Sequence, residues 1–118
     1  MSVAAAQAAA FYAEVAESGP VFAIRDEEGF PAPVNRSGGR SQPFWSKRSR
    51  AERIIKNVAV YQDMFVVEVT RDDWLNKWLP GLESDGMLVG INWSGKGAIG
   101  YDLSPSDAAR NVTALMQG

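Results

Sequence analysis

The chain has 118 residues, 46% of them hydrophobic and 22% charged, with a formal net charge of −2; these values are typical of one folded domain over residues 1–118. It contains no cysteine and no histidine, which excludes disulfides, thiolate metal sites, cysteine nucleophiles and histidine bases. An enzyme of this composition would need carboxylates, lysine or tyrosine with shifted pKa values, so we expect a protein without catalytic residues, cofactor or metal.

The first forty residues predict one helix followed by two short strands. Alanine-rich residues 3–17 favour a helix, which the Ser-Gly-Pro run at residues 18–20 would end. Residues 21–25 predict a strand, and residues 30–34, which contain two prolines, predict a strand at a sheet edge. Residues 36–43 have a Ser-Gly-Gly tip and predict a flexible loop.

No segment is typical of a targeting or membrane sequence. The N-terminal stretch lacks the basic start of a secretory signal and soon reaches Glu14 and Glu17. No apolar run approaches the ~20 residues that a membrane helix needs. We therefore expect a cytoplasmic protein with no membrane contact.

Residues 47–57 predict a helix with one apolar face and basic side chains mainly on its other faces. Its start fits Ser46 as the N-cap, and Ser49 and Glu52 also have the spacing of a capping box. The helix would present its cationic side chains to solvent or to a partner.

The clearest strand covers residues 64–70, where apolar side chains beginning with Phe65 alternate toward one face. Thr70 then has the position of an N-cap for a helix over residues 71–79. We expect the Pro-Gly pair at residues 80–81 to end this helix.

The last third of the chain predicts a hairpin and a closing helix. Residues 87–93 and 98–103 favour two strands joined by a glycine-rich turn. Ser104 as N-cap and Pro105 at the first helical position predict a helix that runs to about residue 116. The whole pattern indicates the α+β class, with a mostly antiparallel sheet of about five strands and about four helices packed on it.

Residues 90–97 nearly match the phosphate-binding motif G-x-x-x-x-G-K-[ST]. The residue after Lys96 is Gly97, which lacks the hydroxyl that would bind Mg²⁺, and the following residues look extended rather than helical. The sequence therefore favours a hairpin turn over a nucleotide site.

The charges are unevenly distributed, because residues 36–56 hold seven basic side chains and one acidic one, a charge of +6, and the rest of the chain therefore carries −8. Such a segment fits a solvated face, a contact for an acidic protein partner, or a surface for single-stranded nucleic acid on which an aromatic ring stacks against a base. The candidate binding residues are Arg40, Trp45, Lys47, Arg48, Arg50, Arg53 and Trp78.

Two tryptophans of the helix over residues 71–79, Trp74 and Trp78, fit either the core or an exposed aromatic surface. Tryptophan and arginine dominate binding hot spots. Our leading hypothesis is a non-enzymatic protein-binding module, in which an acidic partner is steered to the basic segment and Trp45 or Trp78 acts as the anchor.

A third hypothesis, besides protein binding and nucleic-acid binding, is an enzyme that depends on carboxylates. Its candidate group is Asp102 beside Tyr101 and Asn92, because two adjacent strands could bring these residues together in a pocket. An edge strand and a surplus of aromatic residues would also suit a homodimer.

Several short motifs resemble those of one family of small bacterial proteins. They are Pro43-Phe44-Trp45-Ser46 before the basic helix, Trp78-Leu79-Pro80-Gly81-Leu82 with Asp85-Gly86, and Val89-Gly90-Ile91-Asn92-Trp93 with Gly100-Tyr101-Asp102-Leu103. The family they resemble is catalogued as domain of unknown function 2750, and the likeness would span about residues 10–115. The resemblance implies a bacterial, stand-alone cytoplasmic domain and supplies no catalytic residues.

Overall fold

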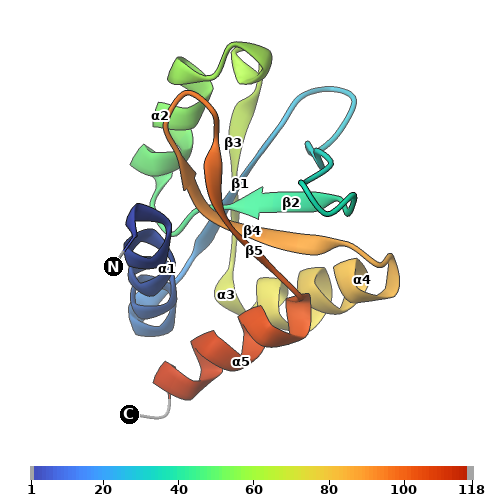
Figure 1. Cartoon of the computed structure of the whole chain (residues 1–118). Coiled ribbons are helices and arrows are strands. Elements are labelled where there is room, and N and C mark those ends of the chain that lie inside the picture. The colour runs from blue at the N-terminus through green and yellow to red at the C-terminus, as the bar shows by residue number, and fades with distance from the viewer. Residues whose placement is uncertain (1, 117–118) are drawn as a thin grey trace.

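Two small β-sheets, joined by one bridge, lie at the centre of the fold, and helices pack around them (Figure 1). The computed structural model describes residues 2–116. Along these residues the α-helices, the strands, a 3₁₀-helix (η1) and a π-helix (η2) follow in the order α1 (Val3–Ser18), β1 (Val21–Arg25), β2 (Ser41–Phe44), α2 (Arg48–Asn57), η1 (Ala59–Tyr61), β3 (Phe65–Val69), α3 (Arg71–Asp73), η2 (Trp74–Trp78), α4 (Leu79–Ser84), β4 (Leu88–Ser94), β5 (Ile99–Leu103) and α5 (Pro105–Met116).

One sheet pairs β1 with β3 in antiparallel fashion, and the other has the strand order β2-β4-β5. β4 and β5 form the predicted antiparallel hairpin, but β2 runs parallel to β4. Two backbone hydrogen bonds between Phe22 and Trp45, both 2.8 Å long, join β1 to the end of β2. The α+β class is confirmed, and the five strands of residues 2–116 are divided between two sheets, one of them mixed.

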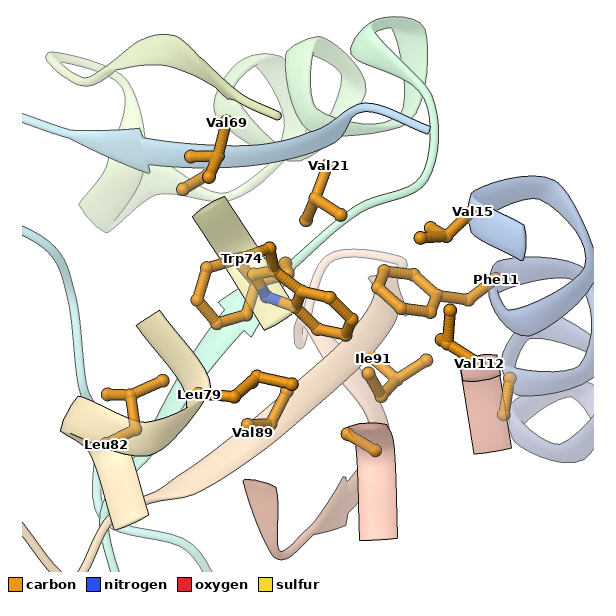
Figure 2. Close-up of a cluster of buried hydrophobic side chains, with 14 residues drawn as sticks. Phe11, Val15, Val21, Val69, Trp74, Leu79, Leu82, Val89, Ile91 and Val112 are labelled. Carbon is orange, nitrogen blue, oxygen red and sulfur yellow. The ribbon is translucent and has the colours of Figure 1, made fainter. Parts of the chain in front are cut away.

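The larger core surrounds Trp74, which is fully buried at the start of η2 (Figure 2). Its indole meets the ring of Phe11 from α1 edge-on at 5.5 Å between centroids, and the ring of Phe44 from β2 at 5.8 Å. Ring pairs of this geometry contribute about 0.5–1.5 kcal/mol beyond the area they bury. Aliphatic side chains of α4, α5 and both sheets fill the remaining space, so this core holds those helices and α1 to one face of the β4–β5 hairpin.

A smaller core lies between α2 and the β1–β3 sheet. One of its two tryptophans, Trp45, is fully buried, and its Nε1 donates a hydrogen bond to the backbone oxygen of the other, Trp93, 2.9 Å away. Ile54 of α2 and Tyr61 of η1 pack beside these rings. The segment that leads into α2 is therefore held inside the protein by its aromatic side chain.

The strand predicted for residues 30–34 is wrong, and the end of the predicted loop is strand β2 instead. The two prolines of this segment have no N–H to donate, and its pairing is limited to a bridge between Val34 and Arg40. Asn35 Oδ1 accepts hydrogen bonds from two backbone N–H groups of the following turn, at 2.9 and 3.1 Å. This side chain folds the turn that brings the chain back to β2.

The helix predicted for residues 71–79 does not end at the Pro-Gly pair of residues 80–81, because a π-turn carries it on to Ser84. The N–H of Leu79 bonds the oxygen of Trp74, five residues back, as in a π-helix. The proline then falls in the first turn of α4, where a missing N–H costs little.

Two predicted N-caps are confirmed, one before α3 and one before α5. The hydroxyls of Thr70 and Ser104 each accept a hydrogen bond from the backbone N–H three residues further along, both at 3.1 Å. The alternation predicted for the strand over residues 64–70 is confirmed for Val67 and Val69, which both pack against the larger core, whereas Phe65 at the start of the strand is 53% exposed. Val66 lies on the opposite face and packs against the smaller core. β3 pairs with β1 alone and lies between two cores, so both of its faces are used.

A β-bulge in the hairpin places two residues, Asn92 and Trp93, opposite one, Gly100. Asn92 has a left-handed φ of 47°, and the extra residue turns Trp93 away from the face that carries Ile91. The indole then covers Gly90 and Gly100, where an added Cβ would come within 2.4 and 2.6 Å of ring atoms. Both positions need glycine because the ring occupies the space of a side chain.

Gly90→Ala should lower the free energy of unfolding by about 2 kcal/mol, because the new methyl group overlaps the Trp93 ring. Gly81→Ala is the matched control: this exposed position in α4 has free space at Cβ, so alanine should stabilise the helix by about 0.5–1 kcal/mol. Urea unfolding followed by circular dichroism measures both. Equal effects of the two substitutions would contradict the packing of Trp93 on the hairpin.

Candidate functional site

A buried polar network joins α1, the lead-in to α2 and β4. Asn92 is 1% exposed; its Oδ1 accepts from the Ser46 N–H at 3.0 Å, and its Nδ2 donates to Ser46 Oγ and to the backbone oxygen of Gln7, both at 3.1 Å. Ser46 Oγ in turn donates to Glu14 Oε1 at 2.7 Å. Both polar atoms of the Asn92 amide are thus paired, as burial of an amide requires.

The network extends to the surface through Glu14. The guanidinium of Arg50 lies 3.1 Å from Glu14 Oε1 and donates to Gln7 Oε1 at 2.9 Å. The Lys47 ammonium is 3.9 Å from Glu14 Oε2. Since the Glu14 and Arg50 side chains are only 26% and 27% exposed, their ion pair is partly shielded from solvent and fixes α1 against α2.

Ser46 is consequently not the N-cap of α2. The N-cap position is held by Lys47, whose side chain makes no capping hydrogen bond, and the capping box of Ser49 and Glu52 does not form. The Ser46 hydroxyl is already committed to Glu14 and Asn92, so it cannot serve the helix start.

A groove of about 660 Å³ lies above this network, between α1, α2 and the turn of the β4–β5 hairpin, which reaches up beside α2 (Figure 1). The α2 side carries Lys47, Arg50 and Arg53. The α1 side carries apolar side chains, Val3 among them, and residues 92–95 complete the lining. We refer to this hollow, with the residues that line it, as the basic groove.

The basic groove has an excess of positive charge. Among residues 2–116, Glu14 is the one carboxylate that pairs with its cations, and it is shared by Lys47 and Arg50. Arg53 is exposed and forms no ion pair with any carboxylate of residues 2–116. Three cations beside one shared carboxylate create a local potential that attracts negative charge.

Helical spacing explains which of the seven predicted binding residues meet. Lys47, Arg50 and Arg53 recur every three residues, fall on one side of α2 and line the basic groove. Arg48 lies on another side, where its Nη2 is 3.5 Å from an oxygen of Glu68 and its guanidinium lies over an aromatic ring of β1.

The other three predicted residues lie away from the groove. Arg40 donates from Nη1 to a backbone oxygen of the preceding loop at 2.9 Å. The expectation that Trp45 anchors a partner at the surface is wrong, because this side chain is fully buried in the smaller core. Trp78 is partly buried and meets Phe30 and Phe44 edge-on, at 5.0 and 5.9 Å between centroids, so it packs against the larger core.

Sequence reasoning missed Gln7 and Glu14 as parts of the site and assigned Asn92 to a different group. Gln7 and Glu14 are seven residues apart, which places them on one face of an otherwise alanine-rich helix. That pair of polar side chains was the available signal. Their partners lie 32 to 85 residues further along the chain, beyond the reach of local patterns.

The grouping of Asp102 with Tyr101 and Asn92 is wrong. The Asn92 side chain bonds toward α1, whereas Asp102 lies on the opposite face of the hairpin, where its Oδ1 accepts from Trp93 Nε1 at 3.1 Å. Tyr101 is 46% exposed. Successive residues of a strand face opposite sides, so the pleat separates Tyr101 from Asp102.

Three kinds of feature are absent from the described residues. The residues after Lys96 form a hairpin turn and then β5, not the helix that a phosphate-binding loop opens. No group of three or more acidic side chains there is placed to hold a metal ion. No helix within residues 2–116 has the length and apolar character to cross a membrane.

The motifs that resemble a known family form the centre of this region: Phe44-Trp45-Ser46 leads into α2, and the glycines of the hairpin accommodate Trp93. A family model described as "Protein of unknown function (DUF2750)" matches residues 8–112. The chain belongs to the DUF2750 family. The DUF2750 match begins within α1 and ends within α5, so it includes the polar network from Glu14 to Asn92. No curated protein and no solved structure matches the chain.

Tyr61 borders a second cleft of this DUF2750 member, next to Trp93 and apart from the basic groove. The residue is 7% exposed. Burial raises the pKa of its hydroxyl above the ordinary value of 10.0, because the charged phenolate is poorly solvated there.

Asn92→Ala should lower the free energy of unfolding by about 3 kcal/mol, because it leaves the Ser46 N–H and the Gln7 oxygen without their partner and places alanine at a positive φ. Asn92→Gly removes the same hydrogen bonds but tolerates the φ, so it should cost about 1 kcal/mol less. Chemical denaturation of both variants separates the two effects. An alanine variant as stable as the wild type would refute a structural role for the network.

The pKa of Tyr61 predicts a loss of stability at alkaline pH. Because the pKa of Tyr61 is higher in the folded state, the hydroxyl ionises first in the unfolded chain. Its contribution to the free energy of unfolding is therefore fully present below pH 10.0 and is lost as the pH rises through the folded-state pKa. The variant Tyr61→Phe has no hydroxyl and so lacks this pH-dependent contribution. Its unfolding free energy should fall less steeply than that of the wild type above pH 10.0, as measured by urea titrations at a series of pH values.

Proposed function

We propose that the protein is a binding module whose basic groove receives an acidic, partly apolar segment of another protein. The observation that carries the proposal is the composition of the two sides: Lys47 at the N-cap of α2 and two arginines within α2 lie across one groove from apolar side chains of α1. A segment with alternate acidic and apolar side chains satisfies both sides at once.

The apolar side distinguishes such a segment from simple counterions. Val3 is 71% exposed, and the methyl groups of Ala6 and Ala10 line the groove beside it. Covering these groups removes apolar surface from water, at about 25 cal/mol per Å². Inorganic anions would pair with the cations and leave this surface uncovered.

The cations differ in their role. Arg50 is held by Glu14 and Gln7, so it maintains the groove as well as lining it. Lys47 is 56% exposed on its side chain, and Arg53 has no carboxylate partner among residues 2–116, so these two supply charge that a partner can use. The attraction of exposed charges is screened by salt over about 10 Å at 0.1 M, so affinity should fall as salt rises.

Single-stranded nucleic acid is a less favoured occupant. Sequence-tolerant binding of single strands relies on aromatic rings on which bases stack. The candidate ring beside the basic helix, Trp45, is fully buried. The aromatic residue in the groove lining, Trp93, is 6% exposed and packs largely against its own hairpin.

Charge reversal in the groove should abolish partner capture. The double variant Lys47→Glu, Arg53→Glu changes two groove cations, and Arg48→Glu, Lys56→Glu changes two basic residues of the same helix outside the groove by the same total charge. Affinity capture from native lysate, read by mass spectrometry, should lose its acidic partners with the groove variant and keep them with the control. Binding of a fluorescent synthetic peptide of alternating Glu and Leu should weaken at least about tenfold in the groove variant.

Equal capture by both double variants would contradict the proposal. A wild-type protein that binds a labelled oligo-thymidine and not the acidic peptide would assign the groove to nucleic acid instead. Thermal melts of each variant establish that both remain folded, which is expected because neither one removes Arg50 from its pairing with Glu14.

A further inference from the structure

A second cleft, of about 510 Å³, lies on the face of the β4–β5 hairpin opposite α1, between the loop of residues 33–37 and the start of β5. It exists because of the bulge at Asn92, which turns Trp93 onto this face over the two glycines. Trp93 and Tyr61 supply its aromatic lining, and Asp102 and Arg36 are its charged residues.

Asp102 brings a carboxylate that the rest of the protein does not neutralise. One oxygen, Oδ1, accepts from Trp93 Nε1 at 3.1 Å, which fixes the side chain against the indole. No lysine or arginine of residues 2–116 lies within ion-pair distance of it. Its second oxygen is therefore available to a donor that enters the cleft.

The Tyr61 hydroxyl is a second unused group. The residue is 7% exposed, yet no group among residues 2–116 bonds its hydroxyl, and this oxygen is not among the described polar atoms sealed from solvent without a partner. The hydroxyl therefore keeps some contact with solvent, and the residue that carries it lines the cleft. Buried tyrosines usually have a partner for this group, so the cleft offers an unfilled hydrogen-bond position.

The opposite charge comes from another segment. Arg36 is exposed on the loop after Val34 and has no carboxylate partner among the described residues. Val34 and Ile99 border the same cleft and are 56% and 70% exposed, which is unusual for large aliphatic side chains flanking one hollow. The cleft thus combines a carboxylate, a guanidinium, a free hydroxyl and an apolar rim.

We propose that this second cleft binds a free α-amino acid with an apolar side chain. The ammonium group pairs with the free oxygen of Asp102 and donates a further hydrogen bond to the Tyr61 hydroxyl. The carboxylate pairs with Arg36, and the side chain covers Val34 and Ile99. A simple amine would leave Arg36 unpaired, and a simple acid would leave Asp102 unpaired, so a zwitterion is the class that uses both charges.

The test is a titration of the full chain with L-leucine, followed by tryptophan fluorescence and by amide shifts in NMR spectra. Isopentylamine and 4-methylpentanoate serve as probes that each lack one charge. Leucine should bind with a Kd of about 1 mM or lower, and each analogue should bind at least about tenfold more weakly. An analogue that binds as tightly as leucine, or the absence of saturable shifts with leucine, isoleucine, valine and methionine alike, overturns the proposal.

Three substitutions test whether Asp102, Arg36 and Tyr61 are the groups that bind the amino acid. Asp102→Asn keeps an acceptor for Trp93 and Arg36→Gln keeps a polar loop, so both should fold and weaken leucine binding about tenfold or more. Tyr61→Phe removes one hydroxyl and should weaken it about threefold to tenfold. Lys96→Gln, which changes a nearby cation outside the cleft, is the control and should bind as the wild type does. Unchanged binding by Asp102→Asn or Arg36→Gln, in a protein whose melting is normal, overturns the assignment.

Discussion

Asn92 and Trp93 share the space opposite a single residue of β5, and this bulge governs the geometry on both faces of the hairpin. Without the extra residue, Trp93 would follow Ile91 onto the face that carries the larger core. With it, Asn92 can bond the backbone of α1 while the indole covers two glycines on the other side. One inserted residue therefore creates the floor of the basic groove and the aromatic lining of the second cleft.

The network around Asn92 positions α1 through directional hydrogen bonds in addition to apolar packing. Alanine side chains are small and alike, so by themselves they determine the rotation of a helix about its axis only weakly. Gln7 and Glu14 supply what alanine lacks, since each meets a partner whose donors and acceptors are fixed by β4 or α2. Buried polar groups of this kind define a unique arrangement because any other would leave them unpaired. The ends of α1 and α2 are thereby set at the spacing that the groove requires.

Local chemistry made part of the fold predictable from the sequence. Thr70 and Ser104 cap helices through contacts three residues away, and the hairpin follows from two short apolar runs around a glycine turn. The strand at residues 30–34 failed because pairing needs a partner strand as well as apolar residues, and β2 found its parallel partner more than forty residues away in β4. Trp45 was misplaced for a similar reason, because the partner of its indole N–H is the backbone oxygen of Trp93, 48 residues further along the chain. For the site, the period of α2 placed three cations together, but their opposing wall came from the first residues of the chain.

The hydrogen bond between Gln7 and Asn92 joins residues that are 85 positions apart, so the basic groove requires both segments to have been synthesised and brought together. Contacts of such sequence separation carry a loop-closure cost that must be met before they can stabilise the fold. A partner that recognises the groove would thus bind the finished tertiary structure and ignore earlier forms. By mass action its binding would also strengthen the docking of α1, so occupancy and completion of the fold would reinforce each other.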